Sequence, residues 1–242
     1  MRPTILTLLA LAAALPSVVS AETTFTSPPT RAHLLELYTS EGCSSCPPAE
    51  SWLSKLKDAP GLWTEFVPLA FHVDYWDRLG WRDPFASKAW TARQYRYSAS
   101  WKSSSVYTPA FVLNGREWRN SGVPSASRET PGVLKISVLN PERVRVNFAP
   151  AKVEGRAYEV HVARLGFDVK INVKAGENRG RELLHDFVVL ALAKAQLGEG
   201  AAEVALPAGT PTPGGTTRRA IVAWVTEAGG MEPLQAVGGW QP

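Results

Sequence analysis

The sequence of 242 residues predicts an α/β domain followed by an all-β, sandwich-like domain. In the first half, short apolar runs alternate with segments of helical spacing, an order typical of α/β domains. In the second half, runs with period-two alternation recur at roughly ten-residue intervals, which indicates an antiparallel sandwich or barrel. Between the halves, residues 119–132 are rich in Ser, Pro, Gly and Arg. We therefore expect one domain over residues 22–120 and a second over residues 130–242.

The first residues have the pattern of a secretory signal peptide over residues 1–21. Arg2 is the positive n-region, Ile5 to Leu15 form the apolar h-region, and Val19-Ser20-Ala21 is a small-residue cleavage site. The apolar run is too short to span a bilayer, and so is every later one. We expect cleavage after Ala21 and an exported protein, periplasmic or extracellular, without stable membrane insertion. The alternative is an uncleaved N-terminal anchor.

The first half is expected to contain four strands and two helices after a polar lead-in over residues 22–30. Asn114-Gly115 after an apolar run is a strong hairpin signal, and Pro60-Gly61 ends the first helix. The expected strands are 33–38, 66–73, 106–113 and 116–119, and the helices carry Ala49, Trp52, Leu53 and Leu56 in one case and residues 84–97 in the other.

The second half is expected to be built of short strands. Residues 191–196 could instead extend as a helix, because Ala, Leu, Lys and Gln are helix formers. Gly176 to Asp186 is polar and is interpreted as a solvated hairpin loop, although Arg179 and Arg181 could contact the first domain or an acidic partner. The expected strands are 133–139, 143–148, 157–163, 168–173, 187–193, 201–206, 220–226 and 234–237.

Composition narrows the classes of function. The formal net charge is +4 and no run of Lys and Arg reaches the length of a nucleic-acid-binding tail. We expect no nucleic-acid partner. A hydrophobic content of 45% is enough for a large core.

The two cysteines, Cys43 and Cys46, form a CxxC motif between an expected strand and an expected helix. A disulfide across so short a loop stabilises a fold by only roughly 2 kcal/mol, so the spacing favours chemistry over a structural cross-link. A helix N-terminus favours a thiolate and lowers the cysteine pKa. Cys43 is then the nucleophile and Cys46 the resolving cysteine. The alternative is a small disulfide that pins a turn.

The residues around this motif affect how strongly the Cys43 thiol is activated. Ser44 and Ser45 could donate hydrogen bonds to a Cys43 thiolate, but capping of the helix is the preferred interpretation. Pro47 and Pro48 suit a first helical turn. They also disfavour helical geometry at the residues before them, which predicts a later helix start.

The segment from His33 to about Arg119 resembles a thioredoxin fold, with a strand, a CxxC at a helix start, a second strand and then Thr108-Pro109 before a hairpin. The first domain is therefore expected to be thioredoxin-like. The resemblance implies that the Thr108–Pro109 bond is cis, faces the cysteines and binds an extended substrate.

The mature chain is more specifically similar to an uncharacterised family of secreted bacterial proteins, known as a domain of unknown function, that join a thioredoxin-like half to a β-rich half. The likeness does not imply an activity. It rests on the segments 36–49, 72–77, 107–109 and 176–181.

Two departures from thioredoxins stand out. The buried Asp of thioredoxin falls near Leu37, which cannot transfer a proton. Glu36 or Glu41 could substitute, but we interpret Glu36 as an edge residue and Glu41 as a solvated loop acid. The residues between the cysteines are Ser-Ser rather than Gly-Pro, so the resemblance implies no reduction potential.

The aromatic segment from His72 to Trp81 is a second candidate region. If it lies beside the CxxC motif, Trp76 could form a wall of the substrate site, because aromatic side chains give contact area at low entropic cost. The alternative, which we prefer for the segment as a whole, is that its aromatic residues are core. We interpret His72 as a strand residue with satisfied hydrogen bonds rather than as a ligand.

We predict an exported thiol–disulfide oxidoreductase with Cys43 and Cys46 as catalytic residues and Thr108, Pro109 and Trp76 as substrate-binding residues. It needs no cofactor or metal, and its partner is a protein thiol or disulfide. The sequence does not predict the oligomeric state. The alternatives are a copper-binding module that uses the two thiolates, and a binding protein on a thioredoxin scaffold with a structural disulfide.

Overall fold

Strands dominate the structure, a computed structural model that describes residues 22–119, 122–153, 155–212 and 218–241. The expected signal peptide lies outside the described residues. The helices are α1 (Pro47–Ser54), η1 (Lys55–Asp58), η2 (Asp74–Leu79) and α2 (Lys88–Ser100), of which η1 and η2 are 3-10 helices. The strands of the first half are β1 (Thr23–Thr26), β2 (His33–Thr39), β3 (Phe66–His72), β4 (Ala110–Leu113) and β5 (Arg116–Trp118).

The second half contributes nine strands to the described residues. Residues 191–196 belong to a strand and not to a helix. The strands are β6 (Gly132–Asn140), β7 (Arg143–Pro150), β8 (Tyr158–Phe167), β9 (Val169–Asn172), β10 (Glu182–His185), β11 (Val188–Leu197), β12 (Ala201–Ala205), β13 (Arg218–Glu227) and β14 (Pro233–Trp240).

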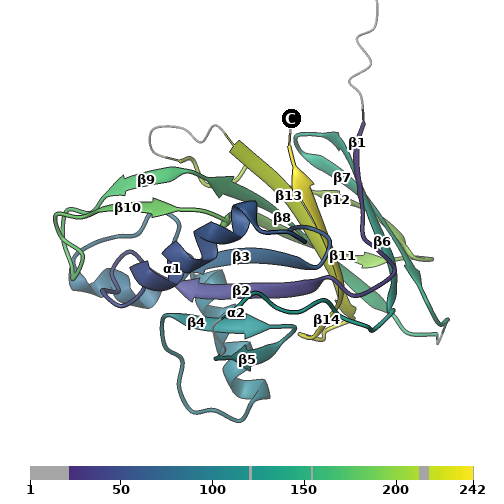
Figure 1. Ribbon diagram of the computed structural model, residues 1–242, viewed down its shortest axis with the longest axis horizontal. Coiled ribbons are helices and arrows are strands. Elements are labelled where there is room, and N and C mark those ends of the chain that lie inside the picture. Colours follow the sequence, from purple (N-terminus) through teal and green to yellow (C-terminus); the bar gives the residue numbers. More distant parts are fainter. Residues whose placement is uncertain (1–21, 120–121, 154, 213–217, 242) are drawn as a thin grey trace, which may run out of the picture.

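One eight-stranded sheet runs through both halves of the chain, in the order β14-β13-β8-β11-β3-β2-β4-β5 (Figure 1). The halves meet where β11 pairs in parallel with β3, and Val188 lies opposite Ala70. The Ala70 N–H also donates to the carbonyl oxygen of Phe187 over 2.8 Å. The prediction of an α/β thioredoxin-like domain followed by an all-β domain is therefore wrong: the molecule is β-rich, with its helices beside one part of a shared sheet.

The main hydrophobic core also combines residues from both halves. Tyr38 and Phe71 of the first half belong to the same buried cluster as Phe187 and Trp224 of the second. The edge of β3 is completed by a strand more than 100 residues away, a pairing that has no local sequence pattern. The expected boundary falls between β5 and β6, and whether each side folds alone stays a prediction.

A second sheet has the order β1-β6-β7-β12. Its apolar face, with Leu134, Ile136 and Val146, packs in one cluster with Val160 and Val162 of the main sheet. This sandwich packing agrees with the alternation read from the sequence. Strand β1 was expected as a polar lead-in, but it pairs with β6 and extends this sheet.

Local turn chemistry is where the sequence was most informative. Asn114 and Gly115 both have positive φ, at 48° and 82°, between β4 and β5. A two-residue type I′ turn requires this conformation, which Asn and Gly adopt at the lowest cost. The expected hairpin is confirmed.

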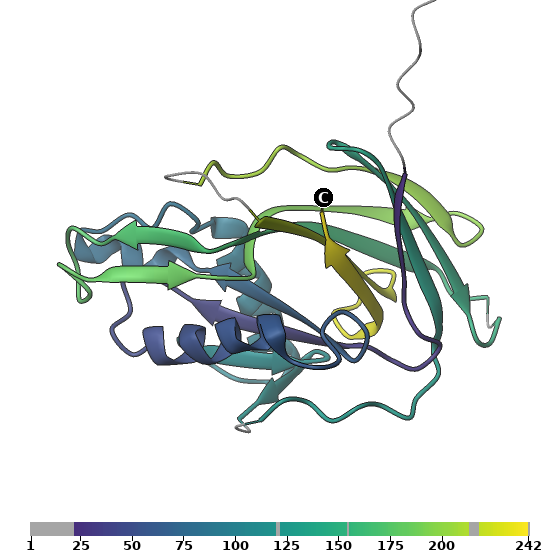
Figure 2. The ribbon, with the colours of Figure 1, turned by 45° about the horizontal axis from the view of Figure 1, so that its top comes forward.

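Strands β9 and β10 form a separate hairpin that extends along the outside of α1 (Figure 2). Strand β10 lies within the segment that was expected to be a polar loop. The hairpin carries the connecting residues Gly176–Arg181 to the start of α1, where the CxxC motif lies.

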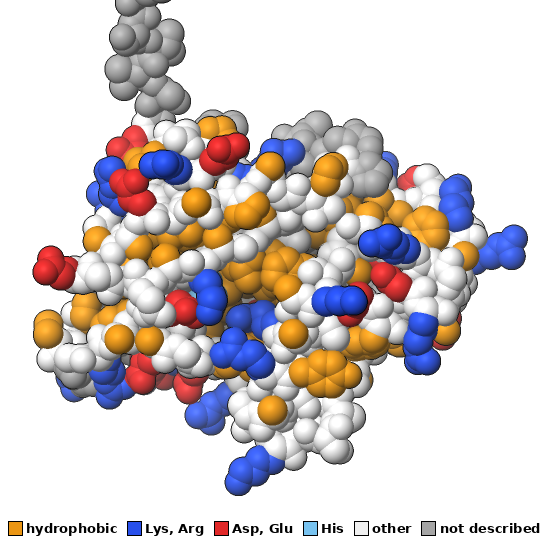
Figure 3. All heavy atoms as spheres, turned by 180° about the vertical axis from the view of Figure 1, so that it is seen from behind, with side chains coloured by type: hydrophobic (Ala, Val, Ile, Leu, Met, Phe, Trp, Pro, Cys, Tyr) orange, Lys and Arg blue, Asp and Glu red, His pale blue; other side chains and the backbone are white. Residues whose placement is uncertain are grey.

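On the face opposite to that of Figure 1, apolar side chains gather near the middle, with Lys and Arg side chains around them (Figure 3). Among the described residues, none of the helices is long and apolar enough to cross a membrane.

Candidate functional site

Cys43 and Cys46 form a disulfide between the end of β2 and the start of α1, with their Cα atoms 5.5 Å apart. Both residues are 0% exposed, whereas Ser44 and Ser45 between them are exposed. The Ser45 Oγ lies 3.4 Å from the Cys43 Sγ. No side chain caps α1, so the expected capping role of the two serines is not observed.

The helix starts directly at Pro47, because Cys46 already has helical geometry, with φ −76° and ψ −37°. The predicted later start is wrong. Pro47 and Pro48 have no N–H, and the N–H groups of Ala49 and Glu50 both donate to the Cys46 carbonyl oxygen. The N–H groups of Ala49 and Glu50 are therefore not free for a thiolate. The helix dipole and the nearby Ser45 hydroxyl are what favours a charged sulfur here.

The cis Thr108–Pro109 bond is tied to the CxxC loop through Trp76. The Trp76 Nε1–H donates to the Thr108 Oγ1 over 2.8 Å. Trp76 also packs closely against Gly42 of the CxxC loop. A Cβ atom added to Gly42 would lie only 2.9 Å from the Trp76 Cβ. The structure thus brings the three residues predicted to bind substrate close to the CxxC loop. Their role stays a prediction.

The loop Gly176–Arg181, called here the cover loop, lies on the CxxC segment. The Asn178 Nδ2 donates to the carbonyl oxygens of Glu41 and Cys43, each over 2.9 Å. The Glu177 carboxylate accepts from the Ser44 N–H over 2.9 Å. Asn178 is fully buried. The interpretation of this segment as a solvated loop is therefore wrong, although the contacts come from Glu177 and Asn178 and not from the expected arginines.

A buried group of acids and imidazoles lies next to the CxxC loop, and we call it the histidine cluster. Its members come from the CxxC loop, α1, the end of β3, the segment before α2 and the end of β10. Each is at most 6% exposed. They are Glu41, Glu50, His72, Asp83 and His185.

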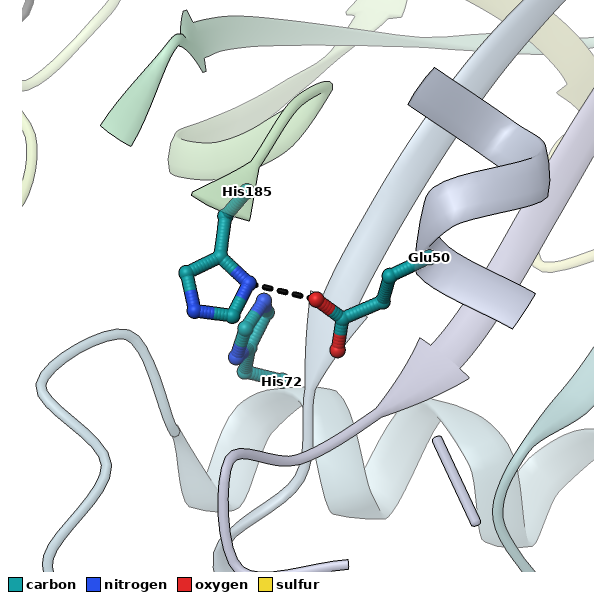
Figure 4. A group of neighbouring side chains, drawn as sticks. All are labelled: Glu50, His72 and His185. Carbon is teal, nitrogen blue, oxygen red and sulfur yellow. Dashed lines mark hydrogen bonds and ion pairs between the residues drawn. The ribbon is translucent and has the colours of Figure 1, made fainter. Parts of the chain in front are cut away.

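Each histidine of this cluster contacts a carboxylate. The His72 Nδ1 lies 2.7 Å from the Asp83 Oδ2, and the His185 Nδ1 lies 2.5 Å from the Glu50 Oε2. The His185 Nε2 is 3.2 Å from the Glu41 Oε1, without the alignment of a hydrogen bond. The two rings are 5.1 Å apart between centroids. Figure 4 shows a nitrogen of His72 beside the bond between His185 and Glu50.

The carboxylates are in turn held by neutral donors. The Glu50 Oε1 accepts from the Thr39 hydroxyl over 2.5 Å, and the Glu41 Oε2 accepts from the Trp81 Nε1–H over 2.6 Å. The Asp83 Oδ2 also accepts from the Glu41 N–H over 2.9 Å. These bonds fix the carboxylates in orientation before any ligand arrives.

The charges of the cluster shift its pKa values strongly. Burial disfavours the imidazolium, but the charges of Glu50 and Glu41 and the hydrogen bond with Glu50 outweigh it and raise the pKa of His185 to about 10. Burial lowers the pKa of His72 as well, but the charge of Asp83 and its hydrogen bond to His72 outweigh burial, so this pKa is raised above its usual value. Burial raises the pKa values of Glu50 and Asp83, but the neighbouring histidines lower them below their usual range.

Sequence reasoning missed most of this cluster. Glu41 was interpreted as a solvated acid, but it is 0% exposed. Glu36, which lies outside this cluster, was interpreted as an edge residue and is also 0% exposed. His72 was interpreted as fully hydrogen-bonded, yet its Nε2 has no partner. His185 was not considered, and the available signal was that it ends an apolar run directly before Asp186. Sequence separation hid its meeting with Glu50, 135 residues away.

A family model described as "Protein of unknown function (DUF1223)" matches residues 34–226. No curated protein matches the chain significantly. Two solved structures are similar. A protein from Agrobacterium tumefaciens is 24% identical with a TM-score of 0.57, over 85% of this chain and 92% of that one. HBP35 of Porphyromonas gingivalis is 14% identical with a TM-score of 0.53, over 87% of this chain and 75% of that one. These likenesses show the fold alone.

Proposed function

Because the chain belongs to the DUF1223 family of proteins of unknown function, its activity has to be inferred from its own residues, and we propose that it is a thiol–disulfide oxidoreductase. One observation supports this most: its two cysteines are bonded to each other at the start of α1, close to Trp76 and the cis Thr108–Pro109 bond. We further propose that it acts after export on a protein thiol or disulfide.

The chemistry is an exchange of two electrons that needs no cofactor. A substrate thiolate attacks the Cys43 sulfur, the bond to Cys46 breaks, and Cys46 leaves as a thiolate that takes up a proton. A second substrate thiol gives up its proton and attacks the mixed disulfide, so the substrate leaves oxidised and Cys43 leaves as a thiol. The same steps in reverse reduce a substrate disulfide.

Thr108 and Pro109 are proposed to seat an extended substrate segment, with Trp76 as a wall. All three residues are half-buried, so each keeps exposed surface for a ligand. The bond from the Trp76 Nε1–H to the Thr108 Oγ1 fixes the ring without occupying its face. A rigid aromatic face offers contact area at low entropic cost.

The cover loop has to move for exchange to occur, because both cysteines are 0% exposed. Three hydrogen bonds, two from Asn178 and one to Glu177, hold the loop on the CxxC segment. A net hydrogen bond contributes about 0.5–1.5 kcal/mol, so opening at this place costs only a few kcal/mol. The cover is therefore compatible with slow, gated exchange.

The burial of both cysteines also favours a second function, a binding protein in which the disulfide is structural. The reduction potential distinguishes the two. Thiol trapping across a dithiol redox series should give a value between about −120 and −270 mV for an exchanging pair. A value below about −300 mV would identify a structural disulfide and overturn the proposal.

A trapping experiment tests the roles of the two sulfurs. Cys46→Ser keeps the attacked Cys43 and removes the resolving thiol, so it should accumulate mixed disulfides with exported proteins. Cys43→Ser is the matched control and should accumulate far fewer. Equal trapping by both variants would contradict the assignment of Cys43 as the exchanging sulfur.

A further inference from the structure

The histidine cluster has the composition and orientation of a metal site, and we propose that Glu50, His72 and His185 bind a divalent transition-metal cation. One ligand atom from each of these residues lies within 4.8 Å of the other two. The ligands come from α1, β3 and β10, so the fold itself brings them together. Two imidazoles and one carboxylate are a ligand set of catalytic zinc and of non-haem iron.

The orientation of His72 is that of a ligand. Its Nδ1 is bonded to Asp83 over 2.7 Å, which leaves the Nε2 to present a lone pair. That Nε2 is buried and has no hydrogen-bond partner. A buried nitrogen without a partner costs free energy unless a ligand satisfies it.

His185 also lies between two carboxylates, in a different arrangement. Its Nδ1 is bonded to Glu50 over 2.5 Å, and its Nε2, which has no hydrogen-bond partner, lies 3.2 Å from Glu41. Figure 4 shows one nitrogen of each ring on the side of Glu50. The other nitrogen lies next to Asp83 in His72 and next to Glu41 in His185. Carboxylates behind metal-bound histidines are the usual device that orients the ring and raises its basicity.

The excess of carboxylates in the histidine cluster also favours binding of a cation. Three buried carboxylates, Glu41, Glu50 and Asp83, make ion pairs only with the two histidines within the described residues. Two imidazolium protons would balance two of the three charges. A divalent cation on neutral imidazoles supplies the same two charges and satisfies the open lone pairs at once.

An entry route exists on the side of Glu50. A groove of about 370 Å³ between α1 and the β9–β10 hairpin reaches this carboxylate, which is 6% exposed. Its lining is more apolar than polar and includes the charged residues Arg181 and Glu182. The groove is lined by Pro47, Pro48, Glu50, Ser51, Ser54, Arg181, Glu182, Leu183 and Leu184.

The site is independent of the proposed thiol chemistry. Cys43 and Cys46 are bonded to each other, and a disulfide is not a thiolate ligand. Binding to the oxidised protein therefore reports the histidine cluster, whether or not the disulfide proves redox-active.

The test is calorimetric titration of chelator-treated, disulfide-bonded protein with Zn²⁺. We expect one ion per chain. Glu50→Gln and His185→Gln should each weaken binding at least about 100-fold, and Asp83→Asn about 10–100-fold through loss of the supporting carboxylate. His161→Gln, which changes a buried histidine outside the cluster, is the matched control and should leave affinity unchanged.

A second measurement keeps the test decisive if a cluster variant does not fold. In the wild-type protein, Zn²⁺ should shift the imidazole ¹⁵N resonances of His72 and His185 and leave those of His161 in place. The Cys43→Ser/Cys46→Ser double variant should retain binding. Absence of zinc binding, binding unaffected by Glu50→Gln, loss of binding in the double cysteine variant, or unshifted His72 and His185 resonances would each overturn the proposal.

Discussion

Two of the buried ionic clusters in the described part of the chain differ in how completely they are paired. In the first, here the arginine cluster, Arg93 bonds both Glu36 oxygens, over 2.8 and 3.0 Å. The Tyr97 and Tyr38 hydroxyls donate to the same carboxylate. One acid thus meets one guanidinium, and each carboxylate oxygen has two donors. The histidine cluster instead contains three acids and has buried atoms without partners.

The pKa values of His161, near the arginine cluster, and His185, in the histidine cluster, reflect this difference in pairing. His161 stacks on Trp224, whose ring also faces Arg93. Burial and the charge of Arg93 lower the pKa of His161 to about 3, whereas the acids around His185 raise its pKa to about 10. The same buried side chain is neutral near the complete pair and cationic near the incomplete one. The comparison teaches that pairing, and not burial of charge, distinguishes a structural cluster from a candidate site.

The largest expected effect comes from breaking the arginine cluster. Arg93→Met leaves Glu36 buried without its cation and should lower the free energy of unfolding by about 3–5 kcal/mol. Urea denaturation with the disulfide intact measures it. Glu36→Gln/Arg93→Met should recover much of the loss, because no uncompensated charge remains. A double variant as unstable as the single one would contradict a self-contained pair.

The next effect concerns zinc, which should stabilise the protein through the histidine cluster and not through the arginine cluster. Zn²⁺ at about 100 times its dissociation constant should stabilise the wild type by about 2.7 kcal/mol. The matched variants are Tyr97→Phe, which alters the arginine cluster and should keep this gain, and His185→Gln, which should lose it. Urea denaturation with and without zinc gives both values. Equal gains in the two variants would place zinc binding elsewhere.

A third effect follows from the lowered pKa of His161. Below pH 6.5 the unfolded chain takes up a proton at this residue and the folded chain, with a pKa of about 3, does not. Stability is therefore lost as the pH falls, by about 2 kcal/mol between pH 6.5 and 5. His161→Gln should remove this part of the decline in a series of urea denaturations. Parallel pH profiles would show that His161 is protonated in the folded state.

The smallest effect concerns the cover loop. Asn178→Ala removes the two hydrogen bonds that this side chain donates to the CxxC segment, together with one that it accepts from Arg181 within the loop. A cost of about 1.4 kcal/mol at the cover corresponds to a roughly tenfold faster reduction of the disulfide by dithiothreitol. Arg179→Ala, an exposed change in the same loop, is the control. Thiol trapping over time measures both rates. If both variants react like the wild type, the cover loop does not limit access.

The sequence predicted what depends on local chemistry. The Asn114-Gly115 turn and the CxxC at a strand–helix junction follow from residues next to each other. The nearness of Trp76 to that junction was only a condition of the substrate-wall interpretation, and core packing was preferred for its segment. The pairing of β3 with β11 and the meeting of Glu50 with His185 were not predictable in this way. They join residues more than 100 positions apart, and no period of 2 or 3.6 residues encodes such a contact.

The narrow joint between β3 and β11 has a consequence for the dynamics of the site. Only Val188 and Ala70 are paired in this ladder, whereas β8 and β11 pair along nine residues of each strand. In thermal fluctuations the sheet should open first between β3 and β11, because few hydrogen bonds join these two strands. His72 lies two residues after Ala70, and His185 lies three residues before Val188. His72 at the end of β3 and His185 just before β11 are thus attached to the two strands that this short ladder joins, and a fluctuation that opens the ladder should separate the two imidazoles.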